Sequence, residues 1–242
     1  MEELKITGIY DNTSRQEGLI SGWGFAVLVS RPGFHLLFDT GADVNVLRNN
    51  METLEISPEK LDGVMLSHPH CDHVGGISGI LRDNTDLTVY MTEGFPEDLK
   101  NKVKDYGAEL VDIGEKKVLS PGLISTGELT GGYRGKEIPE QSLIAGTDRG
   151  PVVISGCAHP GITKIVGNAK RIKGESPHLI LGGFHLGSSS REEINGVLEE
   201  FERFGVERIA PTHCTGNKAI NIIEREYGNG LLQFGAGEEV VL

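Results

Sequence analysis

Short apolar runs that end in turn residues recur along the chain. Runs of this length, rich in β-branched and aromatic residues, predict buried strands. They are FAVLV (25–29), HLLF (35–38), GVMLS (63–67), LTVYM (87–91), PVVIS (151–155), HLILG (178–182) and RIAP (208–211). Because the runs fall into two groups along the chain, we expect two sets of strands.

Helical patterns lie between these runs. The clearest is SREEINGVLEEFERFG, in which Ser190 and Glu193 form a capping box and Gly205 stands where the helix should end. Its apolar residues keep the i, i+3, i+4, i+7 spacing of a helix with one buried face: Ile194, Val197, Leu198 and Phe201. Further helices are predicted over ISGILRDN (77–84) and over 218–227.

No linker or low-complexity segment divides the chain. Two groups of strands with helices between them predict an α/β protein with four αββα layers and a single domain over residues 1–242. Residues 120–150 carry little periodicity, and we expect a hairpin and a loop over the site there. Together with an irregular segment over 81–104, they are predicted to form the walls of the pocket.

The composition narrows the possible partners. A net charge of −12 with no basic stripe opposes binding to a nucleic-acid backbone, so a small molecule is the expected partner. No apolar run approaches the roughly 18 residues of a membrane span, and the N-terminus MEELKITGIY lacks the pattern of a signal peptide. Cys71, Cys157 and Cys214 show no disulfide spacing. We therefore expect a cytoplasmic protein that binds no membrane, and the sequence gives no oligomeric state.

The densest group of potential metal ligands is SHPHCDHVGG (67–76), which follows a predicted strand. His68 and His70, two residues apart in an extended loop, can point to the same side, while Asp72 and His73 face a neighbouring point. Neutral imidazole and carboxylate are ligands of zinc and related ions. The alternative, a solvated polar turn, does not explain such a density of histidine. Two adjacent metal positions are therefore predicted here.

Further histidines and cysteines end later predicted strands. His159 in GCAHPG and His213 in PTHC are predicted metal ligands, because a strand end with Gly-Cys-x-His has little structural reason to exist. His185 in GGFHL belongs to the site, and its role stays open between a metal ligand and a residue that faces the substrate or supports a ligand. The role of Cys157 stays open between ligand and buried residue, and Cys214 is predicted to be a small buried residue.

The pattern H-x-H-x-D-H after an apolar strand resembles the signature of the metallo-β-lactamase superfamily. FDTG resembles its Asp-x-Gly turn, in which Asp39 would support ligands without binding metal. The combination of WGF, FDTGA, SHPHCDHVGG, GCAHPGI, GGFHL and PTHCTG is similar to the branch that contains the archaeal 7,8-dihydropterin-6-methyl-4-(β-D-ribofuranosyl)aminobenzene-5'-phosphate synthase, from about Gly22 to Gly216. This resemblance implies a four-layer αββα metallo-β-lactamase-like sandwich. It also implies one or two bound divalent metal ions, most often zinc, with manganese or iron as alternatives.

One position departs from the pattern of the superfamily. After the strand LTVYM its members often supply a third histidine for the first metal, and this chain has Thr92, a poor ligand. The resemblance then implies that His159 replaces that histidine and that Cys157 stands where other members carry an aspartate or cysteine ligand. His35 and His178 lie within apolar strands and are predicted to make ordinary hydrogen bonds.

Hydrolysis is the default reaction for such a site, because a bound metal lowers the pKa of water from about 15.7 to about 7. Asp72 would orient this water and shuttle its proton, and His185 would stabilise the developing oxyanion. The prediction is a metal-dependent hydrolase for a small ester, lactone or phosphoester.

Three alternatives remain beside hydrolysis. The resemblance offers a transferase in which an aromatic amine displaces diphosphate from a pterin, and the Thr92 departure leaves room for a metal-binding scaffold without catalysis. A third alternative, a di-iron flavoprotein, is disfavoured because His70 stands where those proteins usually carry glutamate.

Overall fold

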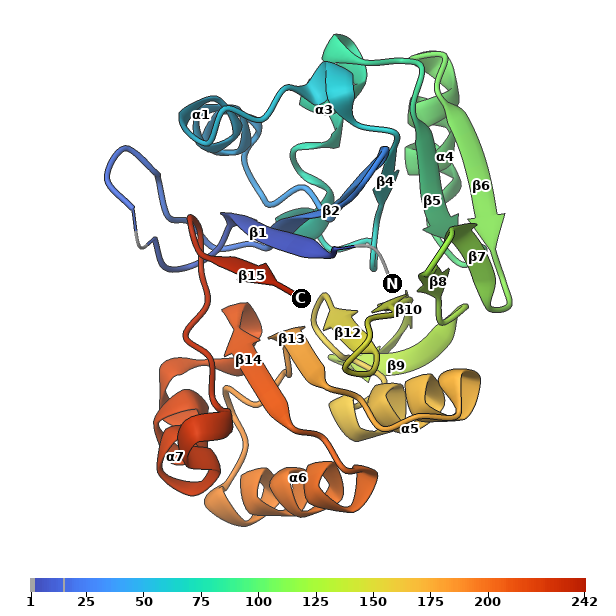
Figure 1. The fold of residues 1–242 in the computed structure, drawn as a ribbon. Coiled ribbons are helices and arrows are strands. Elements are labelled where there is room, and N and C mark those ends of the chain that lie inside the picture. Colours follow the sequence, from blue (N-terminus) through green and yellow to red (C-terminus); the bar gives the residue numbers. More distant parts are fainter. Residues whose placement is uncertain (1–2, 15) are drawn as a thin grey trace. The chain divides into compact units, whose positions relative to one another are not determined.

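The structure is a computed structural model that describes residues 3–14 and 16–242. These residues form two compact units. The first unit contains the chain up to Gly114 together with Gly235–Leu242, and the second unit contains Glu115–Phe234. Each unit has its own sheet, helices and core (Figure 1). The predicted α/β class is confirmed, and the single domain over 1–242 stays a prediction.

The sheet of the first unit combines antiparallel and parallel pairing. In sheet order its strands are β15 (Glu239–Val241), β1 (Lys5–Tyr10), β2 (Ala26–Arg31), β3 (Phe34–Phe38), β4 (Gly63–Met65), β5 (Thr88–Thr92) and β6 (Glu109–Ile113). Pairing is antiparallel from β15 to β3 and parallel from β3 to β6. Because carboxyl ends of parallel neighbours meet at one edge, the residues that follow β3 and β4 lie close together.

The helices of the first unit connect these strands. They are α1 (Val44–Thr53), η1 (Pro58–Lys60), α2 (Cys71–Val74), α3 (Ile77–Asp83) and α4 (Glu97–Asp105). Helix α1 begins where the Asp43 carboxylate accepts hydrogen bonds from the backbone N–H groups of Asn45 (2.7 Å) and Val46 (3.3 Å). Such a cap contributes about 1 kcal/mol. Leu47 and Met51 of α1 then pack into the core of this unit.

The sheet of the second unit holds the later predicted strands. In sheet order its strands are β14 (Arg208–Thr212), β13 (Leu179–Gly183), β12 (Val152–Ser155), β11 (Leu143–Ala145), β8 (Leu123–Ser125) and β7 (Lys117–Ser120), and a separate hairpin is formed by β9 (Leu129–Tyr133) and β10 (Lys136–Glu140). β12, β13 and β14 are parallel. Their carboxyl ends therefore bring GCAHPG, GGFHL and PTHC to one edge of the sheet.

Helices α5, α6 and α7 cover this sheet (Figure 1). The helical segments of this unit are α5 (Ile162–Lys173), α6 (Arg191–Phe204), η2 (His213–Thr215), α7 (Asn217–Tyr227) and η3 (Gly228–Gly230). The predicted capping box of α6 is confirmed: the Glu193 N–H donates to Ser190 Oγ (3.2 Å), and the Ser190 N–H donates to Glu193 Oε2 (2.7 Å). Ile194 and Phe201 are fully buried, and each contributes roughly 1.5–3 kcal/mol by leaving water.

Every predicted strand and helix is present, with ends shifted by about one or two residues. The hairpin expected within 120–150 is confirmed as β9 and β10, but the expectation of an irregular loop for the rest of this segment is wrong, because β8 and β11 also lie there. The prediction of an irregular segment over 81–104 is wrong, because these residues contain β5 and most of α4. In α4 only Leu99 and Val103 are apolar, so its helical pattern is weak. No helix of the described residues is long and apolar enough to cross a membrane.

Candidate functional site

The predicted ligands of the first unit lie in the turn after β4. His70 occupies the position before the short helix α2, which contains Asp72 and His73. The ring centre of His68 lies 4.8 Å from that of His70 and 4.1 Å from that of His73. An Asp72 carboxylate oxygen lies 3.9 Å from Nε2 of His73. The structure therefore brings these four side chains together, as the spacing of the motif predicts.

Asp39, at the end of β3, is the buried anchor of this cluster. Its Oδ2 atom accepts hydrogen bonds from Nδ1 of His73 (2.7 Å) and from the Ser67 hydroxyl (2.7 Å), and Oδ1 accepts one from the Ser67 N–H (2.7 Å). Nδ1 of His68 lies 2.9 Å from the same hydroxyl. Because the hydroxyl gives its proton to Asp39, Nδ1 of His68 must be the donor. In both imidazoles Nδ1 thus carries the proton, and Nε2 is the ring atom with a lone pair suited to a metal.

Burial and hydrogen bonding shift the pKa of Asp39 in opposite directions. Burial raises the pKa of this carboxyl above its usual value, although His73 and Ser67 act in the opposite direction. Asp39 also has a φ of 59°, a region that few residues other than glycine adopt. Such strain persists where surrounding contacts fix the backbone. Here the strained backbone sets the position of the Asp39 carboxylate.

Glycines let the backbone of this turn pass close to its neighbours. A Cβ added to Gly75 would lie 2.1 Å from the carbonyl oxygen of Ala42, and one added to Gly76 would lie 2.3 Å from that of Thr40. Any larger residue at these two positions would clash with the backbone of the loop after β3.

Trp23, in the loop between β1 and β2, also belongs to this cluster. Its indole Nε1–H donates a 2.7 Å hydrogen bond to Oδ2 of Asp72. In the sequence, WGF contributes only to the resemblance to the superfamily, and no role is predicted for Trp23. The missed signal is the tryptophan between two glycines, a large ring on backbone that can approach its neighbours closely.

In the second unit, Glu140 of β10 has the role that Asp39 has in the first. Its Oε1 atom accepts from the N–H groups of Cys157 (3.0 Å) and Ala158 (2.7 Å). Its Oε2 atom accepts from the His159 N–H (2.8 Å) and lies 2.8 Å from Nδ1 of His159. A carboxylate accepts from Nδ1–H, so Nε2 of His159 is again the ring atom with a lone pair suited to a metal. Sequence reasoning missed Glu140, whose only signal was a carboxylate in the weakly periodic hairpin.

The pKa of Glu140 moves in the direction opposite to that of Asp39. Burial raises it, but hydrogen bonds from the imidazole and backbone of His159 and from Ala158 outweigh burial and lower the pKa below its usual value. Glu140 is therefore an ionised carboxylate at neutral pH. It fixes the loop GCAHPG and the orientation of its histidine together.

An aromatic side chain of the hairpin lies over the histidines of the second unit. The ring centre of Tyr133 is 5.5 Å from that of His159 and 5.4 Å from that of His185, and these two imidazoles are 4.7 Å apart. The Arg134 guanidinium lies 5.1 Å from the centre of the tyrosine ring. A Cβ on Gly131 would lie 2.2 Å from the backbone of His159. The expectation of a hairpin over this part of the site is confirmed within the second unit.

Cys157, His185 and Cys214 form a cluster at the edge of the same sheet. Both sulfur atoms and a ring nitrogen of His185 lie within 4.8 Å of one another. Both cysteines pack on Gly183, where an added Cβ would lie 2.6 Å from Sγ of Cys214 and 3.2 Å from Cα of Cys157. Cys214 is half-buried and lies among potential metal ligands, and its predicted role as a small buried residue stays a prediction.

The Cys214 thiol is easily deprotonated. Burial raises its pKa, but hydrogen bonds with Cys157 and His185 and the charges of His213 and His185 hold the pKa well below its usual range. A thiolate is a ligand that zinc and softer metal ions favour. The cluster adds sulfur donors to the imidazoles of the second unit.

The remaining histidines are His213, whose role as a ligand stays a prediction, and the framework residues His35 and His178. His213 is buried at the end of β14 with a φ of 51°. His35 contacts the Ser30 hydroxyl (3.0 Å), and His178 contacts the Glu207 carboxylate (2.8 Å), so their prediction as ordinary hydrogen-bonded residues is confirmed. Thr92 is buried in β5 and carries no imidazole.

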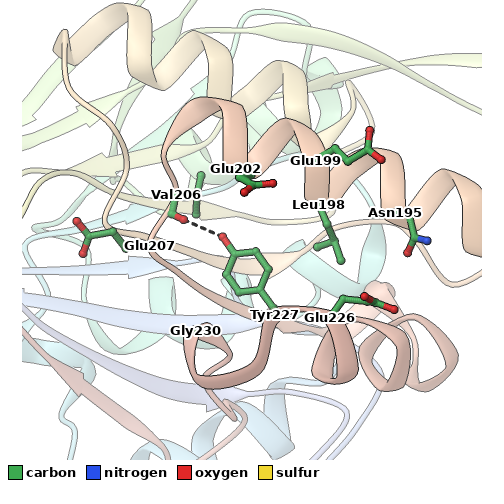
Figure 2. A pocket seen from close by; sticks show the side chains of 9 residues that line it. All are labelled: Asn195, Leu198, Glu199, Glu202, Val206, Glu207, Glu226, Tyr227 and Gly230. Atoms are coloured by element: carbon green, nitrogen blue, oxygen red, sulfur yellow. Dashed lines mark hydrogen bonds between the residues drawn. The ribbon is translucent and has the colours of Figure 1, made fainter.

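A cavity of about 510 Å³ lies between α6, α7 and η3 (Figure 2). Its lining is Asn195, Leu198, Glu199, Glu202, Val206, Glu207, Glu226, Tyr227 and Gly230. The Tyr227 hydroxyl donates a 2.8 Å hydrogen bond to the Val206 carbonyl, drawn as a dashed line in Figure 2. Four of the lining residues are glutamates, so the cavity repels anions and contains none of the predicted ligands.

Comparison with known proteins identifies the family of this chain and several proteins that are similar to it. The profile of the metallo-β-lactamase superfamily matches residues 24–213. The 7,8-dihydropterin-6-methyl-4-(β-D-ribofuranosyl)-aminobenzene-5'-phosphate synthase of Methanocaldococcus jannaschii is 28% identical over 90% of this chain and 88% of that protein. The solved structure of Tm1679, a metal-dependent hydrolase of the β-lactamase superfamily, has a TM-score of 0.81 and 29% identity and covers 98% of both chains. A ribonuclease Z of Nanoarchaeum equitans is 28% identical over 38% of this chain and 32% of that protein.

Proposed function

Because the chain belongs to the metallo-β-lactamase superfamily and has its fold, we propose that it is a metal-dependent hydrolase acting on a small ester, lactone or phosphoester. The observation that carries this proposal is a matched pair of supported histidines. In each unit a buried carboxylate contacts Nδ1 of a motif histidine: Asp39 that of His73, and Glu140 that of His159. Fully buried carboxylates that fix imidazole tautomers are typical of metal sites, because they orient the ligand and raise its basicity.

The proposed ligands are those that the motifs predict. They are His68, His70, Asp72 and His73 of the first unit and His159, His213 and Cys157 of the second. Imidazole, carboxylate and thiolate are donors that suit divalent ions, and we propose one or two such ions, with zinc as the first choice and manganese or iron as alternatives.

The residues of the chain have distinct parts in the proposed hydrolysis. A divalent metal in such a site lowers the pKa of bound water to about 7 and polarises a carbonyl or phosphoryl oxygen. Asp72, anchored by the Trp23 N–H, orients the attacking water and accepts its proton. His185 donates a hydrogen bond to the oxyanion that develops, and Tyr133 covers it. Asp39 and Glu140 keep the ligand imidazoles in the required tautomer.

A second candidate function is transfer to a pterin. It is favoured by the similarity to the synthase, which extends over 90% of this chain. In this reaction the same ligands would hold a diphosphate leaving group while an aromatic amine forms the new C–N bond. The ribonuclease Z match covers 38% of the chain, and a net charge of −12 opposes a nucleic-acid substrate, so a small molecule stays the proposed partner.

Metal analysis and a substrate panel test the proposal. Protein purified without added metal should contain one or two equivalents of zinc, manganese or iron by elemental analysis. It should hydrolyse at least one member of a lactone, phosphodiester, β-lactam and thioester panel. Turnover of a pterin diphosphate with an aromatic amine, without hydrolysis of the panel, would select the transferase. A metal content near zero would instead indicate a scaffold without catalysis.

Histidine variants provide the matched control. His70→Ala and His159→Ala should abolish turnover and lower the metal content, because each removes a proposed ligand. His35→Ala and His178→Ala remove framework histidines from the same two units and should keep the metal content of the wild type. Equal metal loss in all four variants would contradict the ligand assignment.

A further inference from the structure

The single tryptophan of the chain, Trp23, lies largely in solvent. Its exposed fraction is 61%, although burial of an indole ring is normally favourable. The exposed apolar area of one ring is far smaller than the roughly 800 Å² that each partner contributes to a stable protein interface. The ring is the right size to contact a small molecule.

The backbone around Trp23 is closely packed, and its conformation is restricted. The Gly22 N–H donates to the Asp11 carbonyl (3.0 Å), and the Phe25 N–H donates to the Asp72 carbonyl (3.2 Å). Gly24 has a φ of 152°, and a Cβ there would lie 2.7 Å from the same Asp72 carbonyl oxygen. The position of Trp23 is therefore set before any ligand arrives, which lowers the entropy cost of binding.

The orientation of the ring follows from its hydrogen bond to Asp72. An indole N–H lies in the plane of the ring, so this 2.7 Å bond uses the edge of Trp23 and does not occupy a face. Asp72 is also 3.9 Å from Nε2 of His73. A molecule that stacks on Trp23 would thus lie beside the proposed metal ligands.

We propose that Trp23 is a binding platform for a planar aromatic or heteroaromatic group of the substrate, and that its N–H positions Asp72. The place of this platform beside the reacting centre rests on the proposed function, whereas stacking itself does not. Offset stacking on an indole favours flat rings over saturated rings of the same charge and size. The proposal therefore narrows the substrate to one that carries such a ring.

Binding to metal-free protein tests the platform independently of catalysis. Benzoate and pterin are the planar probes, and cyclohexanecarboxylate is the saturated probe matched to benzoate in charge. Calorimetry should show that wild-type protein binds the planar probes and that Trp23→Leu binds them about tenfold more weakly. Trp23→Phe, which keeps a ring, should stay within about twofold of the wild type. Val118→Ala alters another exposed side chain, in the second unit, and should change nothing.

Fluorescence of the unmodified protein gives a second measurement that needs no variant. All tryptophan emission comes from Trp23, and benzoate should protect this emission from acrylamide quenching whereas cyclohexanecarboxylate should not. Absence of protection, or equal binding of planar probes by the wild type and Trp23→Leu, would overturn the platform.

Turnover separates the platform from the positioning of Asp72. With any substrate found for the metal-loaded enzyme, Trp23→Phe should lower kcat at unchanged KM, because it removes only the bond to Asp72. Trp23→Leu should raise KM as well. Unchanged kcat in Trp23→Phe would refute the positioning role. Planar probes that bind an enzyme without metal or turnover would refute the proposed function and leave the platform standing.

Discussion

Glu140→Gln is the sharpest test of how the second unit prepares a metal ligand. The carboxylate accepts hydrogen bonds on both oxygens, two of them at Oε2 from the backbone N–H and Nδ1 of His159 (2.8 Å each). Glutamine offers one carbonyl and one NH₂ group, so one pair of donors must face an NH₂. If this NH₂ faces His159, Nδ1 of the imidazole must accept a hydrogen bond instead of donating one. The proton of the imidazole must then move to Nε2, the atom proposed to bind metal.

The magnitude follows from the number of donors left without an acceptor. Each buried donor that loses its partner costs about 1–3 kcal/mol, so the loss of one pair of donors should lower the free energy of unfolding by about 2–6 kcal/mol in Glu140→Gln. Loss of the supporting carboxylate should also weaken metal binding by about 10- to 100-fold. Urea unfolding of metal-free protein measures the first effect, and competition with a chelator measures the second.

Glu207→Gln is the matched control in the same unit. Glu207 also contacts Nδ1 of a histidine, His178, at 2.8 Å, but 64% of its side chain is exposed. Exposed pairs of this kind contribute about 0–1 kcal/mol, and His178 is not a proposed ligand. Equal losses of stability in the two variants, or unchanged metal affinity in Glu140→Gln, would refute the reasoning.

The pH dependence gives an independent check on Glu140. Its pKa in the folded state lies below the usual 4.5, so its contribution to stability is present above pH 4.5 and is lost as the pH falls through the lowered pKa. Glu140→Gln cannot titrate and should lack this part of the acid dependence in urea unfolding.

Three further predictions concern other parts of the chain. Asp39→Asn should weaken metal binding by about 10- to 100-fold in a chelator competition, whereas Asp62→Asn, at an exposed carboxylate that accepts from the His35 N–H, should not. Burial raises the pKa of Tyr227 from 10.0 to about 12, so the wild type should lose stability as the pH rises from 10 toward 12. Tyr227→Phe should flatten this loss in urea unfolding, and its failure to do so would exclude the hydroxyl as the cause. Ser190→Ala removes a cap and should lower the free energy of unfolding by about 1 kcal/mol, measured by urea unfolding against Ser188→Ala.

The family match confirms the fold that the sequence predicted. Strand runs such as GVMLS and the capped helix that begins at Ser190 could be read locally, because period and caps are set by neighbours in sequence. Helix α5 was missed although Ile162, Ile165, Val166 and Ala169 keep helical spacing. The hydrogen-bonded strand order in each sheet came only from the structure.

The cluster of the first unit was also determined by the sequence, because His68, His70, Asp72 and His73 lie within one short turn and cannot move far apart. The tertiary structure alone decided which residues support them. Glu140 and His159 are separated by 19 positions, and Trp23 and Asp72 by 49. Contacts of that kind depend on how strands align and loops fold back, and no local periodicity encodes them. A short motif thus specifies which donors are available, and the packing of distant segments specifies the tautomer and orientation in which each is held.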